Sequence, residues 1–134
     1  FFTIQAALPL LSQGAAIVLN TSVVSHIGLP GASVYSAAKA ALRSFARTLS
    51  AELAPRGIRV NAVAPGPIET PIFGRMGVPV DQVEGMKSGL AASVPIKRLG
   101  TPDEIAAAVA FLAAPESAYV VGVELDVAGG MGQL

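Results

Sequence analysis

Short apolar runs separate longer amphipathic segments along the chain. Residues 15–19 (AAIVL) are continuously apolar, and residues 58–64 (IRVNAVA) are nearly so. Runs of this length without alternation are typical of strands that are covered on both faces. Residues 120–127 (VVGVELDV) alternate instead, and we expect a half-covered edge strand there, with Glu124 and Asp126 on the face opposite the valines.

Two segments show the apolar spacing of helices, one before the first strand and one between the first two strands. Residues 1–12 look like the end of a helix, which Gln13 and Gly14 terminate. The apolar side chains of residues 33–54 recur at helical spacing, and this pattern predicts a second helix. The residues on that apolar face are Leu42, Phe45, Ala46, Leu49 and Leu53.

The region between the second and third strands contains a long insertion and a well-marked helix. Residues 67–100 are punctuated throughout by proline and glycine, so we expect a lid or insertion with one or two short helices. The next helix begins with Thr101 as N-cap and Pro102 at the first helical position, and Glu104 completes a capping box. Pro115 ends this helix.

The order of these elements predicts an α/β fold. Strands that are separated by helices form a parallel sheet with right-handed crossovers. Neither an internal repeat nor a linker divides residues 1–134.

Composition excludes several classes of protein. Charged residues make up 13% of the chain and the net charge is zero, with no basic cluster longer than Lys97-Arg98, so we expect no nucleic-acid partner. Residues 1–38 contain no charged side chain. Proline, glycine and polar residues interrupt them, so we expect a segment buried in the protein or between subunits, and no membrane segment.

Metal and hydrolase chemistry receive little support from the sequence. The chain has one histidine and no cysteine, so we expect no metal site. The histidine, His26, could pair with Ser22 or Ser25, but no acid lies nearby in the sequence to orient it. We therefore interpret His26 as a loop residue.

Polar residues collect where the predicted strands end. Ser22 follows the first strand, residues 65–70 follow the second, and Tyr35 and Lys39 lie one turn apart at the start of the helix after the first loop. Ligands of parallel sheets bind beyond the carboxyl ends of the strands. A free phenol has a pKa of about 10, and a nearby ammonium favours the phenolate.

Each of these features also has a plainer explanation. Tyrosine and lysine four residues apart are common as a solvated helix pair. Ser22 could be only a capping or loop hydroxyl, and Pro65-Gly66 could be only a turn.

In combination, the motifs resemble the short-chain dehydrogenase/reductase family. Ser22, followed thirteen residues later by Tyr35-Ser-Ala-Ala-Lys39, resembles that family's active-site signature. Residues 61–70 (NAVAPGPIET) resemble its turn beside the nicotinamide, and residues 98–130 resemble its closing helix and strand. The resemblance implies a doubly wound, Rossmann-like parallel sheet, of which this chain is the C-terminal half with three strands and flanking helices.

The resemblance also implies the chemistry. It is that of an oxidoreductase that uses NAD or NADP to interconvert a small-molecule carbonyl and a secondary alcohol, with Tyr35 as general acid/base. Ser22 would donate a hydrogen bond to the reacting oxygen. Lys39 would favour the phenolate form of Tyr35 and hold the nicotinamide ribose. The implied cofactor-binding residues are Tyr35, Lys39, Pro65, Gly66, Ile68 and Thr70. A cytoplasmic homo-oligomer, dimer or tetramer, is implied as well.

Part of the family's pattern has no counterpart here. The glycine-rich cofactor loop and the residue that separates NAD from NADP would lie before Phe1, so we expect residues 1–134 to be the C-terminal catalytic part of a single domain. Ala128 stands where the family's final turn commonly has Asp.

An inactive fragment that acts as an assembly or interaction module is the alternative, and an intact-mass measurement would separate the two. The apolar residues of the lid hint at an apolar or mixed substrate: Ile72, Phe73, Met76, Met86 and Leu90.

Overall fold

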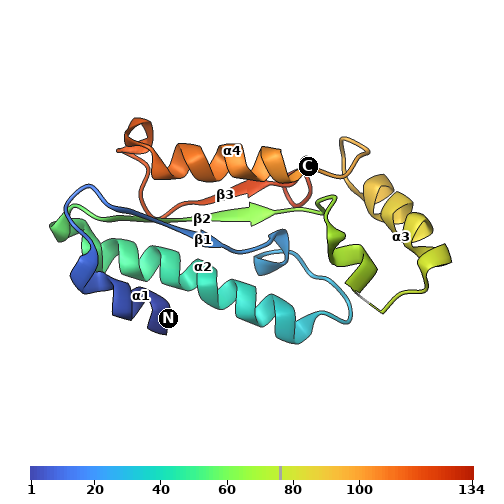
Figure 1. The fold of residues 1–134 in the computed structure, drawn as a ribbon, viewed down its shortest axis with the longest axis horizontal. Coiled ribbons are helices and arrows are strands. Elements are labelled where there is room, and N and C mark those ends of the chain that lie inside the picture. The colour runs from blue at the N-terminus through green and yellow to red at the C-terminus, as the bar shows by residue number, and fades with distance from the viewer. Residues whose placement is uncertain (76) are drawn as a thin grey trace.

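The structure is a computed structural model that describes residues 1–75 and 77–134, and these form an open parallel sheet with helices on both faces (Figure 1). The strands are β1 (Ala16–Asn20), β2 (Arg59–Pro65) and β3 (Glu124–Val127). They lie in the order β1-β2-β3, and both neighbouring pairs are parallel. The predicted parallel α/β sheet is confirmed.

Helices form a layer on each side of the sheet. Figure 1 shows α1 (Phe2–Ala7) and α2 (Ser33–Leu53) on one face and α4 (Pro102–Ala113) on the other. Helix α3 (Val80–Ser93) lies beyond the end of the sheet toward which β2 points. Among the described residues, no helix has both the length and the apolar character needed to cross a membrane.

The main apolar core lies between α2 and β2. Leu49 and Leu53 of α2 pack against Ile58 and Val60, and all four side chains are buried. The predicted apolar face of the second helix therefore faces the sheet. Helix α1 adds Ile4 to this core.

Helix α1 is shorter than the sequence pattern predicts. It ends at Ala7, and a 3-10 turn follows at Leu8–Leu10. Pro9 explains the difference, because proline has no N–H to donate and clashes with the preceding helical turn.

Strand β3 also differs from the prediction in length and in burial. It begins at Glu124, because Gly122 has a φ of +73° that breaks the extended backbone before it. The side chains of Glu124 and Asp126 were expected on an open face, but they are only 5% and 15% exposed. The loop after β1 and Arg43 of α2 cover that face.

The segment between β2 and α4 is closed at its base. Gly100 N donates to the Pro67 carbonyl (3.0 Å) and Glu69 N donates to the Gly100 carbonyl (2.8 Å), so the two ends of the segment lie side by side. Between them lie a 3-10 turn, Pro71–Arg75, and α3, which with 14 residues is longer than the short helices expected there. Met76, one of the apolar residues noted in this segment, lies outside the described residues.

The N-terminus of α4 has the predicted capping box. Thr101 Oγ1 accepts a hydrogen bond from Glu104 N, and Glu104 Oε2 accepts one from Thr101 N (2.8 Å). Arg98 adds a two-pronged contact to the Glu104 carboxylate. These bonds satisfy backbone donors that the first helical turn leaves free.

Replacing Thr101 by alanine is expected to lower the free energy of unfolding by about 1 kcal/mol, because the N-cap acceptor is lost. Thr101→Ser keeps the hydroxyl and is the matched control. Urea denaturation of both variants measures the difference. Equal stability of Thr101→Ala and Thr101→Ser would show that the cap does not stabilise α4.

The same capping box makes stability depend on acid. The hydrogen bonds from Arg98, followed by the bond from the Thr101 backbone, lower the pKa of Glu104 from 4.5 to about 2. A carboxylate with a lowered folded-state pKa stabilises the fold above its unfolded pKa and loses that contribution as the pH falls through its folded pKa. Wild type should therefore exceed Glu104→Gln in stability at neutral pH, and the gap should close between pH 4.5 and about 2. A gap that stays constant over this range in urea titrations would contradict the assignment.

Candidate active site

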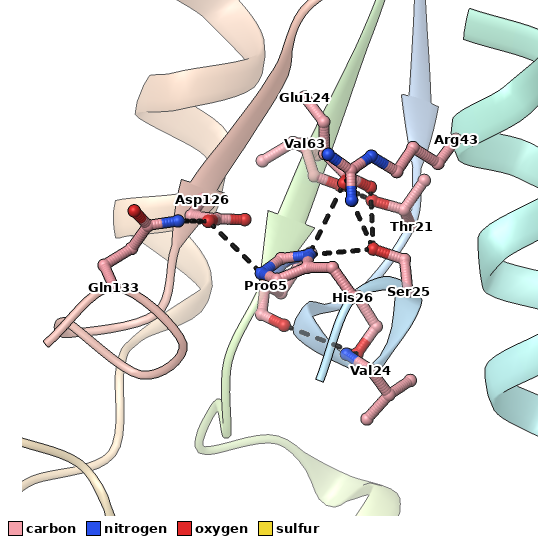
Figure 2. Close-up of polar contacts among 11 residues, drawn as sticks. Thr21, Val24, Ser25, His26, Arg43, Val63, Pro65, Glu124, Asp126 and Gln133 are labelled. Carbon is pink, nitrogen blue, oxygen red and sulfur yellow. Dashed lines mark hydrogen bonds and ion pairs between the residues drawn. The ribbon is translucent and has the colours of Figure 1, made fainter. Parts of the chain in front are cut away.

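Two loops meet at the carboxyl ends of β1 and β2. Thr21 N and Thr21 Oγ1 both donate to the Val63 carbonyl of β2, at 2.9 and 2.8 Å, and so fix the chain where it leaves β1 (Figure 2). Ser22 follows directly and is the N-cap of a short 3-10 turn, η2 (Val23–Ser25). Its Oγ lies 3.5 Å from the Pro65 carbonyl oxygen, to which it donates. The structure thus brings Ser22 beside the loop that leaves β2.

Tyr35 and Lys39 lie on the first two turns of α2. The Lys39 ammonium lies 5.7 Å from the centroid of the Tyr35 ring. Its Nζ donates to the Asn20 carbonyl at the end of β1 (2.9 Å), which holds the lysine side chain at this edge of the sheet. The Tyr35 side chain remains accessible, since the residue is 51% exposed.

The turn after β2 is packed tightly against the turn after β3. Gly66 N donates to the Val127 carbonyl (3.1 Å). A Cβ at position 66 would lie 2.8 Å from the Cα of Ala128, closer than carbon atoms approach without bonding. Glycine at this position therefore lets the backbone of the turn lie against the end of β3.

A cavity of about 510 Å³ opens at this edge of the sheet. It collects five of the seven residues that the sequence nominated: Ser22, Tyr35, Gly66, Ile68 and Thr70. Lys39 and Pro65 do not line it. Each of them instead contacts a residue that does, Lys39 through the Tyr35 ring and Pro65 through the Ser22 hydroxyl.

The cavity lining is apolar and uncharged. None of the described residues that line it is Asp, Glu, Lys or Arg. Its polar side chains are Ser22, Tyr35, Thr70 and Ser93. Much of the remaining wall comes from six apolar side chains: Ile27, Leu29, Ile72, Phe73, Leu90 and Met131. The site can therefore direct a few hydroxyl groups at an otherwise apolar molecule.

The sequence prediction missed the surroundings of His26. Figure 2 shows its ring between Glu124 and Asp126 of β3, with Ser25 and Arg43 beside Glu124. His26 lies in the loop after β1, as expected, but β3 supplies two acidic partners from the far end of the chain that the sequence did not indicate. The alternation in residues 120–127 placed both acids on one face, but nothing in the sequence indicated what covers that face.

Known proteins are similar to this chain over nearly its whole length. A family model described as Enoyl-(Acyl carrier protein) reductase matches residues 1–132. Oxidoreductase asL5 of Sarocladium schorii is 41% identical over 99% of this chain and 52% of its own length. Short-chain reductase protein NovJ of Streptomyces niveus is 44% identical over 88% of this chain and 45% of its own length.

The fold is also found among solved structures. The promiscuous reductase LugOII, which catalyses keto-reduction at C1 during lugdunomycin biosynthesis, matches with a TM-score of 0.88 and 31% identity. The match covers 100% of this chain and 50% of that one. The chain therefore spans about half the length of the relatives that it matches.

Proposed function

Because this chain belongs to the short-chain dehydrogenase/reductase family, we propose that it carries the proton-transfer machinery of an NAD(P)-dependent enzyme that interconverts a carbonyl and a secondary alcohol. One observation carries the proposal. The side chains of Ser22 and Tyr35 line the same cavity at the carboxyl ends of the strands. The ammonium of Lys39 lies 5.7 Å from the centroid of the Tyr35 ring.

The proposed proton transfer uses three side chains of this chain. Tyr35 gives its hydroxyl proton to the carbonyl oxygen in reduction and takes a proton back from the alcohol in oxidation. Ser22 donates a hydrogen bond to the same oxygen and stabilises the negative charge that develops there. Lys39 places a positive charge 5.7 Å from the centroid of the Tyr35 ring, where it attracts the negative charge that develops during proton transfer.

A bound nicotinamide cofactor would supply the hydride chemistry. The residues fit the nicotinamide end of such a cofactor. The turn of Gly66, Ile68 and Thr70 offers backbone groups and a hydroxyl to the cavity, and Gly66 lets that turn lie close to the end of β3. In this proposal Pro65 would shape the turn, and Tyr35 and Lys39 would hold the ribose hydroxyls of the cofactor.

The lining of the cavity supports a substrate that is neutral and largely apolar around its reacting group. A charged substituent buried against apolar walls would lose its hydration without gaining an ion pair. The hydroxyls of Ser22 and Tyr35 provide the polar contacts that one carbonyl oxygen needs. Helix α3 and the turn before it contribute Phe73 and Leu90 to the cavity, so the segment 67–100 acts as a lid in this proposal.

A substrate panel tests the proposal. The full-length protein that contains this chain should oxidise NADH or NADPH in the presence of apolar ketones, and should run the reverse reaction with the matching secondary alcohols. Ketones that differ only by a carboxylate next to the carbonyl are the matched controls, and we expect kcat/KM to be at least about 10-fold lower for them. The absence of turnover with both cofactors across the panel would refute the proposed interconversion of carbonyl and alcohol. The homo-oligomeric state and the cytoplasmic location stay predictions.

A further inference from the structure

His26 bridges two carboxylates that belong to β3 (Figure 2). Its Nδ1 lies 3.6 Å from Glu124 Oε2, and its Nε2 lies 3.4 Å from Asp126 Oδ2. The side chain of His26 is only 18% exposed. Both ring nitrogens thus face carboxylate oxygens of β3, and Nδ1 also lies 3.1 Å from Ser25 Oγ.

Three further side chains complete the cluster. Ser25 Oγ donates to the Glu124 carboxylate, 3.0 and 3.1 Å from its two oxygens. Arg43 of α2 pairs with Glu124 through Nε (3.1 Å), and Gln133 donates to Asp126 Oδ2. The cluster therefore ties the loop after β1, helix α2 and the C-terminal turn to one face of β3.

Both carboxylates of this cluster have partners within the protein. His26, Glu124 and Asp126 each offer one possible ligand atom within 4.8 Å of the others. Arg43 already neutralises Glu124, however, and Asp126 Oδ1 is buried without a hydrogen-bond partner among the described residues. His26 Nε2 and the Gln133 side chain both face Asp126 Oδ2, so we interpret the cluster as a polar network that links these segments.

The network is mechanically connected to Ser22. Ser22 is the N-cap and His26 the C-cap of the single turn η2. Within that turn Ser25 N donates to the Ser22 carbonyl (2.9 Å) and His26 N donates to the Val23 carbonyl (3.1 Å). Because the turn is so short and internally bonded, a displacement of His26 along β3 displaces Ser22 with it.

We propose that His26, held between Glu124 and Asp126, is a positioning residue that fixes η2 against β3 and so aims the Ser22 hydroxyl into the cavity that it shares with Tyr35. His26 does not line that cavity, so it acts through Ser22. The apolar cluster of Val23, Val24 and Ala128 holds the turn on the sheet in a non-directional way. The polar contacts with Glu124 and Asp126 add the direction and register that packing lacks. The catalytic consequence rests on the proposed function, whereas the structural one does not.

Hydrogen exchange tests the structural part independently of activity. In the full-length protein, His26→Ala should raise the amide exchange of residues 24–27 by at least about 10-fold, and should leave the amides of α4 unchanged. His26→Gln keeps one donor and should restore part of the protection. Arg98→Ala, which removes the exposed ion pair to Glu104, is the matched control and should not alter residues 24–27. Unchanged exchange in His26→Ala would overturn the proposal.

A double-mutant cycle tests the link to Ser22. His26→Ala should lower kcat by about 10-fold with little change in the KM of the cofactor, because a misplaced hydroxyl loses its transition-state contact. In a Ser22→Ala background the same change should cost less than about 2-fold, since the group that it positions is gone. If the fold losses in kcat of the two single variants simply multiply in the double variant, the positioning role is overturned. A protein that shows the exchange change but has no turnover with any substrate would refute the proposed function alone.

Discussion

The Tyr35→Phe variant of the full-length protein is expected to lose about 10²–10⁴-fold in kcat, the range that a positioned general acid contributes. Tyr35 lines the cavity together with Ser22 and is 51% exposed, so its hydroxyl is open to a substrate. Phenylalanine keeps the ring that Lys39 approaches at 5.7 Å and removes only the oxygen. Because Lys39 and the turn of Gly66, Ile68 and Thr70 are left intact, the Kd of the cofactor should change far less than kcat.

The chain provides a matched control for this substitution. Tyr119 is its only other tyrosine and is fully exposed in the turn before β3, outside the cavity. Tyr119→Phe removes the same atom and should leave kcat unchanged. Steady-state kinetics with fluorescence titration of the cofactor distinguish the two variants. Wild-type turnover in Tyr35→Phe would remove the proposed acid from the mechanism.

The largest expected effect on stability belongs to Asn61→Ala. Asn61 lies in the middle of β2 and is completely buried. Its Nδ2 donates to the Val120 carbonyl (2.9 Å), and its Oδ1 accepts from Val123 N (3.1 Å). Alanine leaves both backbone groups without these partners and opens a small cavity, so we expect the free energy of unfolding to fall by about 3 kcal/mol.

Asn20 allows the corresponding control for Asn61. It is the other asparagine of the chain, it lies at the end of β1, and it is exposed. Asn20→Ala should change the free energy of unfolding by less than about 0.5 kcal/mol. Chemical denaturation of the full-length protein gives both values. Similar losses for the two variants would mean that the segment before β3 does not depend on the Asn61 amide.

The sequence predicted the elements that local physical chemistry determines. The apolar runs of β1 and β2 carry their own burial signal, and the Thr101 capping box marks the start of α4 by residue types alone. Ser22 and Tyr35 could be placed at one edge because parallel strands end on the same side of a sheet. The cavity that they line together agrees with that inference.

The features that the sequence did not predict depend on contacts between distant segments. The sequence pattern predicted that Glu124 and Asp126 lie on an exposed strand face. In the fold His26, nearly a hundred residues earlier in the chain, covers them. Arg59 stands in an apolar strand with no evident partner in the sequence. In the fold its guanidinium donates to carbonyl groups at the C-terminal end of α4, among them that of Leu112 (2.8 Å). Local pattern cannot reveal such pairs, because each partner is chosen by the topology.

A crystal structure of the full-length protein with nicotinamide cofactor and a bound ketone or alcohol tests the central claim most directly. We predict that the Tyr35 hydroxyl and Ser22 Oγ both lie within hydrogen-bonding distance of the substrate oxygen, with the Lys39 ammonium beside the phenol and the nicotinamide against the turn of residues 65–70. A Tyr35 hydroxyl directed away from the substrate oxygen, with another group of the protein in its place, would contradict the account.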